Sequence, residues 1–315
     1  GGFVFGMYAL DGPDDEFRLG EAIRLETEAD QEIDAQLKGN DRDGYLIGDV
    51  TYANPQTFTV LEGKTQYLGN WGDGTGRISV EEDGVFHLIN RNDEYTLGQL
   101  FGMSANLDSS VDQAVVMIDT FDLNQGGTLS IGLGPVQGGN STGHVDAKDA
   151  DVDDGVLKGH FIAAYYNPAT PEWIYDDVLI ADNDFGTFAE VVSNTPLMQV
   201  TASYNMHAVD TDRYTADLIA TRVAFDQVDG LTENQRQVAA AIEDRYDKLT
   251  DTNYKDMNDF EQMIARIFTL DGTKSYQDAL DMFSAEPYAA TMADMLWSFG
   301  PLQWVLADRI GGGGV

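Results

Sequence analysis

The sequence predicts a mainly β body followed by a helical C-terminal segment. Through the first two thirds of the chain, short runs rich in β-branched and aromatic residues alternate with turns that contain glycine. After Leu231, apolar residues recur at helical spacing almost to the end. Short strands without helices between them fit a sandwich, a barrel or a β-solenoid, and no strict repeat accompanies them.

Residues 1–110 are expected to contain short strands. Glu16–Leu37 mixes acidic and apolar residues and fits either one helix or two polar strands. Gly39–Gly44 predicts a turn. Beyond it, runs separated by glycine turns predict strands at Tyr45–Tyr52, Phe58–Leu61, Gln66–Leu68, Arg77–Val80 and Val85–Ile89.

Residues 111–230 continue this scheme. Gly126-Gly127 predicts a turn, and Gly155–Gly159 is expected to precede a strand. The predicted strands are Ala114–Leu123, Thr128–Leu133, His160–Tyr166, Trp173–Ala181, Phe188–Val192, Met198–Tyr204 and Tyr214–Arg222.

Residues 231–315 are expected to be helical. Thr232-Glu-Asn-Gln235 has the form of a capping box, which begins a helix. Asp271-Gly272 is expected to end a second helix that carries the apolar stripe Phe260–Phe268, and Ser275 to open a third. Pro287 lies near the start of a fourth. We interpret the apolar stripes as core packing.

Charge and composition exclude several classes of protein. The 315 residues carry 54 acidic and 18 basic side chains, for a net charge of −36. This excess argues against partners made of nucleic acid or anionic lipid. The chain has no cysteine, so disulfides, zinc thiolates and thiol catalysis are excluded. With 43% apolar residues it can bury a core, and the acidity is either a solvated surface or a sign of calcium binding.

The two ends of the chain suggest a processed or internal fragment. Gly1 is followed by no basic segment or cleavage site of a signal peptide, and the run Gly311–Gly314 has the composition of a linker. No apolar run reaches the roughly 20 residues that a lipid-spanning helix needs.

Several motifs occur in the order found in one family. They are Val111–Met117 with Gly126–Ile131, the turn Gly186-Thr-Phe188 after Tyr175–Ala181, Leu231–Gln235, and Ala279-Leu-Asp-Met-Phe-Ser-Ala-Glu-Pro-Tyr288-Ala with Arg309. In these motifs the chain from about Ser110 to Ile310 resembles the C-terminal passenger region of bacterial type V autotransporters, where the secreted passenger meets its outer-membrane barrel. Ala285 and Pro287 depart from the commoner residues, and no barrel strands follow Arg309.

The resemblance implies a β-solenoid or β-helix-like body. Residues 1–110 would be its β-rich N-terminal part, residues 111–230 its final strands and a capping, autochaperone-like junction, and residues 231–315 a helical linker toward an outer-membrane β-barrel. A signal peptide is expected before Gly1 and the barrel after Val315. As a helix, Pro287–Ile310 is long enough to thread a barrel pore.

The resemblance also implies a function. We expect an exported protein at the cell surface of a Gram-negative bacterium, with a structural or adhesive role and with neither catalysis nor cofactor. Its partners would be its own or a separate outer-membrane barrel, and a surface glycan, a surface protein or further copies of itself. One alternative is a passenger enzyme that acts on glycans through carboxylates about 5–9.5 Å apart. A second is a calcium-dependent surface assembly subunit.

One acidic segment is the candidate metal site. Asp149, Asp151 and Asp153 alternate as in an EF-hand loop, because oxygen ligands must converge on one calcium ion. However, the glycine comes one place late, at Gly155, and His160 stands where a glutamate is expected. A solvated acidic loop is the alternative interpretation.

Other side chains give weaker signals. His87, His144, His160 and His207 are not at metal-ligand spacing, and a Ser-His-Asp triad would have to be assembled by the fold. The aromatic residues Tyr165, Tyr166, Trp173 and Tyr175 either stack on sugars or, as we expect, fill the end layers of the β body.

Overall fold

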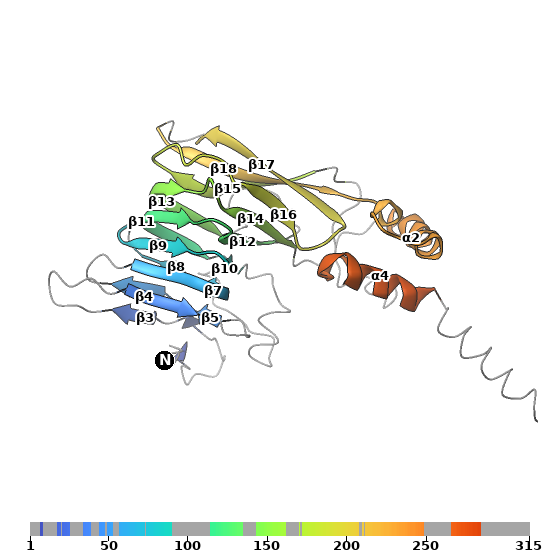
Figure 1. Cartoon of the computed structure of the whole chain (residues 1–315), viewed down its shortest axis with the longest axis horizontal. Coiled ribbons are helices and arrows are strands. Elements are labelled where there is room, and N and C mark those ends of the chain that lie inside the picture. Colours follow the sequence, from blue (N-terminus) through green and yellow to red (C-terminus); the bar gives the residue numbers. More distant parts are fainter. Residues whose placement is uncertain are drawn as a thin grey trace, which may run out of the picture.

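The structure of the chain is a computed structural model. It describes residues 7–8, 18–19, 21–25, 34–38, 44–47, 49–52, 57–72, 74–89, 114–134, 143–161, 170, 172–207, 210, 212–248 and 266–284. Within these ranges the chain forms eighteen strands and two α-helices, so the predicted mainly β class is confirmed (Figure 1).

No strand was predicted at Met7–Tyr8 or at His144–Asp151, whereas most of the predicted strands are present among the eighteen. The eighteen strands are β1 (Met7–Tyr8), β2 (Arg18–Leu19), β3 (Glu21–Leu25), β4 (Asp34–Lys38), β5 (Gly44–Ile47), β6 (Asp49–Tyr52), β7 (Thr57–Leu68), β8 (Asn70–Trp71), β9 (Arg77–Val80), β10 (Gly84–Leu88), β11 (Val115–Leu123), β12 (Thr128–Leu133), β13 (His144–Asp151), β14 (Val156–Phe161), β15 (Trp173–Ala181), β16 (Glu190–Ser193), β17 (Met198–Met206) and β18 (Tyr214–Arg222). The described parts of Glu16–Leu37 are strands, so the helical interpretation of that segment is wrong.

Two arms of parallel strands meet at β7. The first arm is built on the N-terminal half of β7, which pairs with β4 on one side and β9 on the other. Strand β11 then pairs with β9, and β13 pairs with β11. In the second arm, β5, β10, β12, β14 and β16 are stacked through the C-terminal half of β7. The chain passes from one arm to the other at Gly63, whose φ is +73°. The turn predicted there is therefore a corner inside one continuous strand.

The hydrogen-bonded path nearly closes around the core. Eleven strands follow one another from β16 through β7 to β17, and the two end strands lie next to each other. Parallel register aligns side chains of one kind across successive strands. On the first arm the aligned residues are Phe58, Ile78, Phe121 and Ala150, all buried. Their side chains form one wall of the core.

Trp71 joins the walls of the core. Its ring lies edge-on to Phe58 at 4.8 Å, to Tyr67 at 5.1 Å and to Phe86 at 5.8 Å between ring centroids. These three partners come from the two halves of β7 and from β10. Edge-to-face contacts of this kind add to the free energy gained by burying the rings.

One type of turn recurs between the two arms. The amide N–H groups of Gly84, Gly127 and Gly155 donate to the carbonyl three residues earlier, at 2.7 to 2.9 Å. A Cβ atom at Gly127 would overlap the carbonyl oxygen of Val80. Glycine is required there because the backbones of successive passes touch at this corner.

Two predicted segments of the middle region need correction. Asp146–Gly155 was expected to be a loop, but His144–Asp151 forms β13, because Val145, Ala147 and Ala150 fill the core and pair with β11. The segment expected to precede a strand at His160 is itself part of β14, since Leu157 and Phe161 are buried on one face.

An antiparallel hairpin completes the β body. Strand β18 pairs with β15, and β17 pairs with β18 along all nine of its residues. In Figure 1 this hairpin lies at the upper boundary of the stack of strands. The change from parallel to antiparallel pairing marks the end of the two stacked arms.

Two helices follow the hairpin. Helix α2 (Glu233–Tyr246) begins with the predicted capping box, in which Thr232 Oγ1 accepts from the amide of Gln235 at 3.3 Å. Helix α4 (Gly272–Phe283) begins at the dipeptide expected to end a helix. The helical element before this dipeptide ends at Thr269 and residues 249–265 lie outside the described ranges, so the predicted end of the second helix stays a prediction. The third helix starts three residues before the predicted Ser275, because the Asn194 carbonyl accepts from the Gly272 amide and the Asn194 side chain donates to Asp271.

The C-terminal helical prediction is tested only in part. The short 3-10 helices η1 (Phe225–Gln227) and η3 (Arg266–Thr269) flank α2, while Pro287–Ile310 lies outside the described residues. None of the helices in the described part of the chain has the length and apolarity needed to cross a bilayer.

Candidate functional site

The three carboxylates predicted to bind calcium lie on one side of the β body. Asp149 and Asp151 are exposed on β13, where alternation places them on the same face, and Asp153 is exposed in the following turn. In the described ranges no three His, Asp or Glu side chains are grouped closely enough to hold a metal ion. Calcium binding at these residues stays a prediction.

The neighbouring strand extends this acidic face. Asp122 of β11 lies opposite Asp151 in register and forms an ion pair with Arg77 at 2.6 Å. Burial is the main cause that raises the pKa of Asp122, Arg77 lowers it, and Asp151 and Asp149 raise it again. Arg77, together with Lys148, which pairs with Asp119 at 2.8 Å, therefore offsets only part of the acidic charge on this face.

Asp153 has a structural contact of its own. Its Oδ1 accepts a hydrogen bond of 2.9 Å from the amide of Thr187. Gly186, just before it, has a φ of +81°, and a Cβ there would overlap the Asp153 carboxylate. The predicted Gly-x-Phe turn is thus held in place by a carboxylate that was predicted to bind metal.

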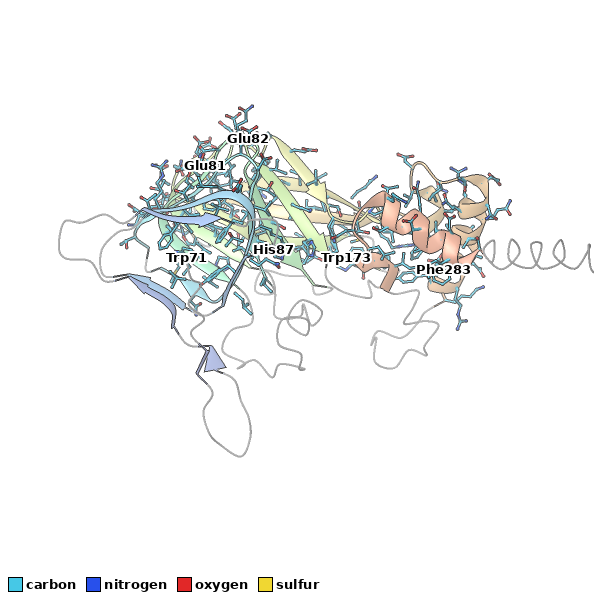
Figure 2. All side chains as sticks on the ribbon, turned by 60° about the horizontal axis from the view of Figure 1, so that its bottom comes forward. Trp71, Glu81, Glu82, His87, Trp173 and Phe283 are labelled. Atoms are coloured by element: carbon cyan, nitrogen blue, oxygen red, sulfur yellow. The ribbon has the colours of Figure 1, made fainter. Side chains whose placement is uncertain are left out.

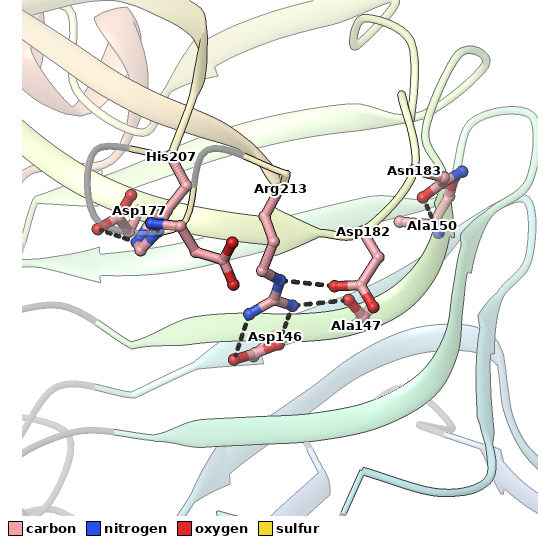
Figure 3. A network of polar contacts seen from close by, with 9 residues as sticks. Asp146, Ala147, Ala150, Asp177, Asp182, Asn183, His207 and Arg213 are labelled. Carbon is pink, nitrogen blue, oxygen red and sulfur yellow. Dashed lines mark hydrogen bonds and ion pairs between the residues drawn. The ribbon is translucent and has the colours of Figure 1, made fainter.

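An arginine cluster joins the hairpin to the parallel body (Figure 3). Arg213 donates to both carboxylate oxygens of Asp146, to Asp182 at 2.6 Å and to the carbonyl of Ala147 at 3.0 Å. The hydrogen bond to Asp146 is the main cause that raises the pKa of Arg213. One guanidinium therefore connects the start of β18 to β13 and to the end of β15.

A second polar group lies at an irregularity of β15. The register of β15 against β18 shifts between Tyr175 and Leu179, and Asp177 within this bulge has a φ of +57°. Thr215 donates to Asp177 at 2.7 Å, and His207 lies 3.6 Å from the same carboxylate (Figure 3). Bulges often re-aim a side chain in this way, and here the redirected carboxylate lies against the hairpin.

The second arm carries a buried histidine–serine pair. His87 Nδ1 and Ser130 Oγ share a hydrogen bond of 2.9 Å, and both side chains are buried. The His160 ring lies edge-on to His87 at 5.0 Å between centroids. Alternation along β10, β12 and β14 places all three on the side of the arm opposite the aromatic core.

Burial and nearby positive charges favour the neutral form of both His87 and His160. Burial is the main cause that lowers the pKa of His87 well below 6.5, and Lys64, His160 and Lys158 lower it further. Burial, opposed by Asp271, also lowers the pKa of His160 to about 4. His87 Nε2 is buried without a hydrogen-bond partner among the described residues.

The pair does not have the geometry of a serine nucleophile site. A triad needs a carboxylate on the second imidazole nitrogen and a hydroxyl that substrate can reach. Here the second nitrogen has no such carboxylate in the described ranges, and Ser130 is only 2% exposed. The pair is a buried polar contact between two strands.

The junction between body and helices has its own core. The Phe225 ring contacts Tyr246, Phe268 and Tyr276, with centroids 5.3 to 6.5 Å apart. Tyr276 Oη donates to the carbonyl of Phe225 at 2.7 Å. Figure 2 shows the helices at one end of the β body, with Phe283 among them. Phe225 thus fixes both helices and η3 to the end of β18.

An ion pair reinforces this junction. Arg222 donates through both Nη atoms to Glu243 of α2, and Glu243 also accepts from the Phe225 amide at 2.8 Å. The Arg222 and Glu243 side chains are 14% and 16% exposed. Burial lowers the pKa of Arg222, but the hydrogen bonds that Arg222 donates to Glu243 and the negative charge of Glu243 raise it, and the net direction is upward.

The sequence did not reveal most of these contacts. The residues that bind Arg213 come from β13 and β15, and Ser130 is 43 positions from His87, so local pattern cannot pair them. A polar residue at alternate positions of an otherwise apolar strand, as at His87 and Ser130, was the only available signal. The expectation for Trp173 and Tyr175 is confirmed, since both are buried, whereas Tyr165 and Tyr166 lie outside the described residues.

Comparisons with known proteins identify no relative of this chain. No protein-family model, no curated protein and no solved structure matches the chain.

Proposed function

We propose that the chain is an exported passenger of the autotransporter type, with a β-solenoid body, a capping junction and a structural or adhesive role on the surface of a Gram-negative bacterium. One observation carries the proposal. Successive passes of the chain pair in parallel and in register on two arms, and the same turn recurs between the arms. A solenoid in which each coil pairs with the next gives this pattern.

The hairpin supports the capping part of the proposal. A stack of parallel strands ends in unpaired backbone groups, which template aggregation unless something covers them. Strand β18 pairs with β15, and Arg213 binds the hairpin to two earlier strands. The end of the stacked arms is thereby paired and held by charge-assisted hydrogen bonds.

The helices support a junction toward a further part of the protein. Phe225, Arg222 and Glu243 dock α2 and α4 against the last strand, so the chain leaves the body through a packed helical unit. In the proposal, residues 231–315 then lead to an outer-membrane barrel.

The side-chain chemistry favours a structural or adhesive role over an enzyme. The histidine–serine pair is buried, and Asp146, Asp177 and Asp182 bind side chains of the hairpin. These groups are occupied in stabilising the fold. The exposed face of β11 and β13 is rich in carboxylates, which suits a surface that contacts cationic or hydrated partners.

Surface display tests the proposal. The gene, with its own flanking sequence, is expressed in a Gram-negative host, and intact cells are treated with protease. We expect cleavage of the chain while a periplasmic marker survives. Phe225→Asp, which places a charge in the junction core, should reduce the displayed amount, and Met282→Asp should not, since Met282 is 76% exposed.

Two outcomes of this experiment would contradict export to the cell surface. A chain that stays in the cytoplasm, or that is protected on intact cells and cleaved only after lysis, is not an exported passenger. Beads coated with the purified chain then test adhesion, because an adhesive surface retains them on bacterial or host cells more than beads coated with serum albumin.

A further inference from the structure

The face of the second arm that points away from the aromatic core carries a row of hydrogen-bonding side chains. In register across four strands, the row consists of Gln66 of β7, His87 of β10, Ser130 of β12 and Lys158 of β14. His160 lies on the same face next but one after Lys158, and its ring is 5.0 Å from that of His87 between centroids. Because paired strands lie about 4.8 Å apart, one small ion over this row contacts side chains from more than one strand.

One nitrogen of His87 has no partner. Nδ1 shares its hydrogen bond with Ser130, whereas Nε2 is buried without a hydrogen-bond partner in the described part of the chain. When Ser130 donates to Nδ1, or when the ring is protonated, Nε2 carries a hydrogen and needs an acceptor. A buried donor that is left unpaired costs free energy, so this position favours a ligand that brings an oxygen acceptor.

Positive charge surrounds the two imidazoles. Burial and then the charges of Lys64 and Lys158 lower the pKa of both His87 and His160. Asp271, just before α4, is the one described carboxylate that acts on either ring, and it acts on His160. In a chain with 54 acidic and 18 basic residues, the charges around this pair favour a negative ligand. A metal ion would be repelled by the two lysines.

Solvent reaches one side of this cluster. Lys158 and His160 are partly buried, while His87 is fully buried beside them. Gly132 of β12 pairs with His160, so the position next to that ring has no side chain. A small ion therefore approaches from the side of Lys158 and His160 and meets the inner histidine behind them.

We propose that His87, His160 and Lys158 form an oxyanion site, which binds a sulfate or phosphate group together with a proton. The two imidazoles donate hydrogen bonds to oxygens of the group, and the ammonium groups of Lys158 and Lys64 balance its charge. Binding is linked to protons, because an anion beside an imidazole favours the charged form that burial and the lysines disfavour. The inference does not depend on the proposed function.

Melting temperatures in sodium sulfate and in sodium chloride at equal ionic strength test the site. Sulfate keeps its charge between about pH 5 and about pH 8, so a pH dependence of its effect comes from the protein. At about pH 5 we expect sulfate to raise the melting temperature by about 3 °C more than chloride does, and at about pH 8 by less. Equal melting temperatures in the two salts at both pH values overturn the proposal.

Variants separate the site from the general effect of sulfate, which stabilises proteins because it is excluded from their surface. Lys158→Gln and His160→Gln should each remove most of the excess over chloride and weaken sulfate binding in isothermal titration by about tenfold. Lys158 is only partly buried, so Lys158→Gln keeps the test if His160→Gln fails to fold. Lys148→Gln and His207→Gln remove the same kinds of side chain elsewhere and should leave sulfate binding unchanged. An excess that survives in Lys158→Gln shows that the effect is general, and the proposal is then wrong.

Two further measurements identify the source of the group and the role of the histidines. If glucose 6-sulfate raises the melting temperature and glucose does not, the site accepts the group on a sugar, whereas an effect of inorganic sulfate alone assigns the site to a free ion. Titration at about pH 5 in two buffers with different heats of ionisation should show uptake of about one proton with each sulfate. Sulfate binding without proton uptake overturns the assignment to the two histidines.

Discussion

At the scale of single residues, Gly186 combines a left-handed backbone with a close carboxylate. Its φ is +81°, and an added Cβ would overlap Asp153. We predict that Gly186→Ala lowers the free energy of unfolding by about 3 kcal/mol, from backbone strain and the displaced carboxylate together. Thermal and urea unfolding measure this change.

Gly74 supplies the matched control. Its φ is +84°, but no atom lies within 4 Å of the position of an added Cβ. Gly74→Ala should therefore cost only the strain of the left-handed conformation, about 1 kcal/mol. Equal costs at Gly74 and Gly186 would contradict a special role of the Asp153 contact.

The two neighbouring histidines predict a dependence of stability on pH. In the folded chain the pKa of His87 is well below 6.5 and that of His160 is about 4. Both rings are neutral when folded, and unfolding lets them bind protons near pH 6.5. Their contribution is therefore unchanged above pH 6.5 and is lost as pH falls from 6.5 toward about 4. Lys64 and Lys158 deepen this loss, and Asp271 opposes it.

The measurement is the difference between two chains. Melting temperatures of the unaltered chain and of the His87→Gln/His160→Gln variant are compared from pH 8 to pH 4. Because carboxylates titrate in both, their effect cancels, and the unaltered chain should lose more stability below pH 6.5. Parallel curves would show that burial does not keep the imidazoles neutral.

At the scale of elements, the contact between β18 and α2 depends on one carboxylate. Glu243 is hydrogen-bonded to Arg222 and to the Phe225 amide in a largely buried position. Glu243→Gln removes the nearer charged partner of the guanidinium and leaves only the exposed Asp247 at 3.5 Å, so it should lower the free energy of unfolding by about 2 kcal/mol. Hydrogen exchange of amides in α2 and α4 should rise more than exchange in β11.

An exposed pair on α4 provides the comparison. Lys274 and Asp278 form an i,i+4 ion pair of 2.9 Å, with side chains 84% and 60% exposed. Asp278→Asn should change stability far less than Glu243→Gln does, since water screens such pairs. A cost at Asp278 as large as at Glu243 would mean that burial does not decide the strength of these contacts.

At the scale of the whole molecule, the net charge of −36 destabilises the compact state through repulsion. Raising the sodium chloride concentration from about 0.02 M to about 0.5 M should increase the melting temperature by about 5 °C or more, because the screening length falls. A melting temperature that is constant or falls with salt would contradict this account.

Specific calcium binding is distinguished from general charge screening by comparing melting temperatures in calcium chloride and sodium chloride at equal ionic strength. If Asp149, Asp151 and Asp153 bind the ion, calcium chloride raises the melting temperature beyond sodium chloride, and changing all three residues to Asn removes the excess. Equal effects of the two salts leave these carboxylates as a solvated acidic face.

Many of the strands and the start of α2 were predictable because they depend on local chemistry. Arg77–Val80, Thr128–Leu133, Trp173–Ala181 and Tyr214–Arg222 are strands with the predicted bounds. Alternation, glycine turns and the capping box at Thr232 act over a few residues. The mainly β class followed from these signals.

Prediction from local sequence failed where a contact with a residue distant in the chain sets the secondary structure. The acidic segment around Asp149 is a strand because β11 pairs with it, and Gly272 begins a helix because Asn194 binds its amide. The sequence by itself determined the kinds of element, the charge and the absence of cysteine chemistry. Only the tertiary structure decided which strands pair, that His87 meets Ser130, and that Arg213 binds Asp146 and Asp182. Each of these contacts depends on residues brought together from far apart in the chain.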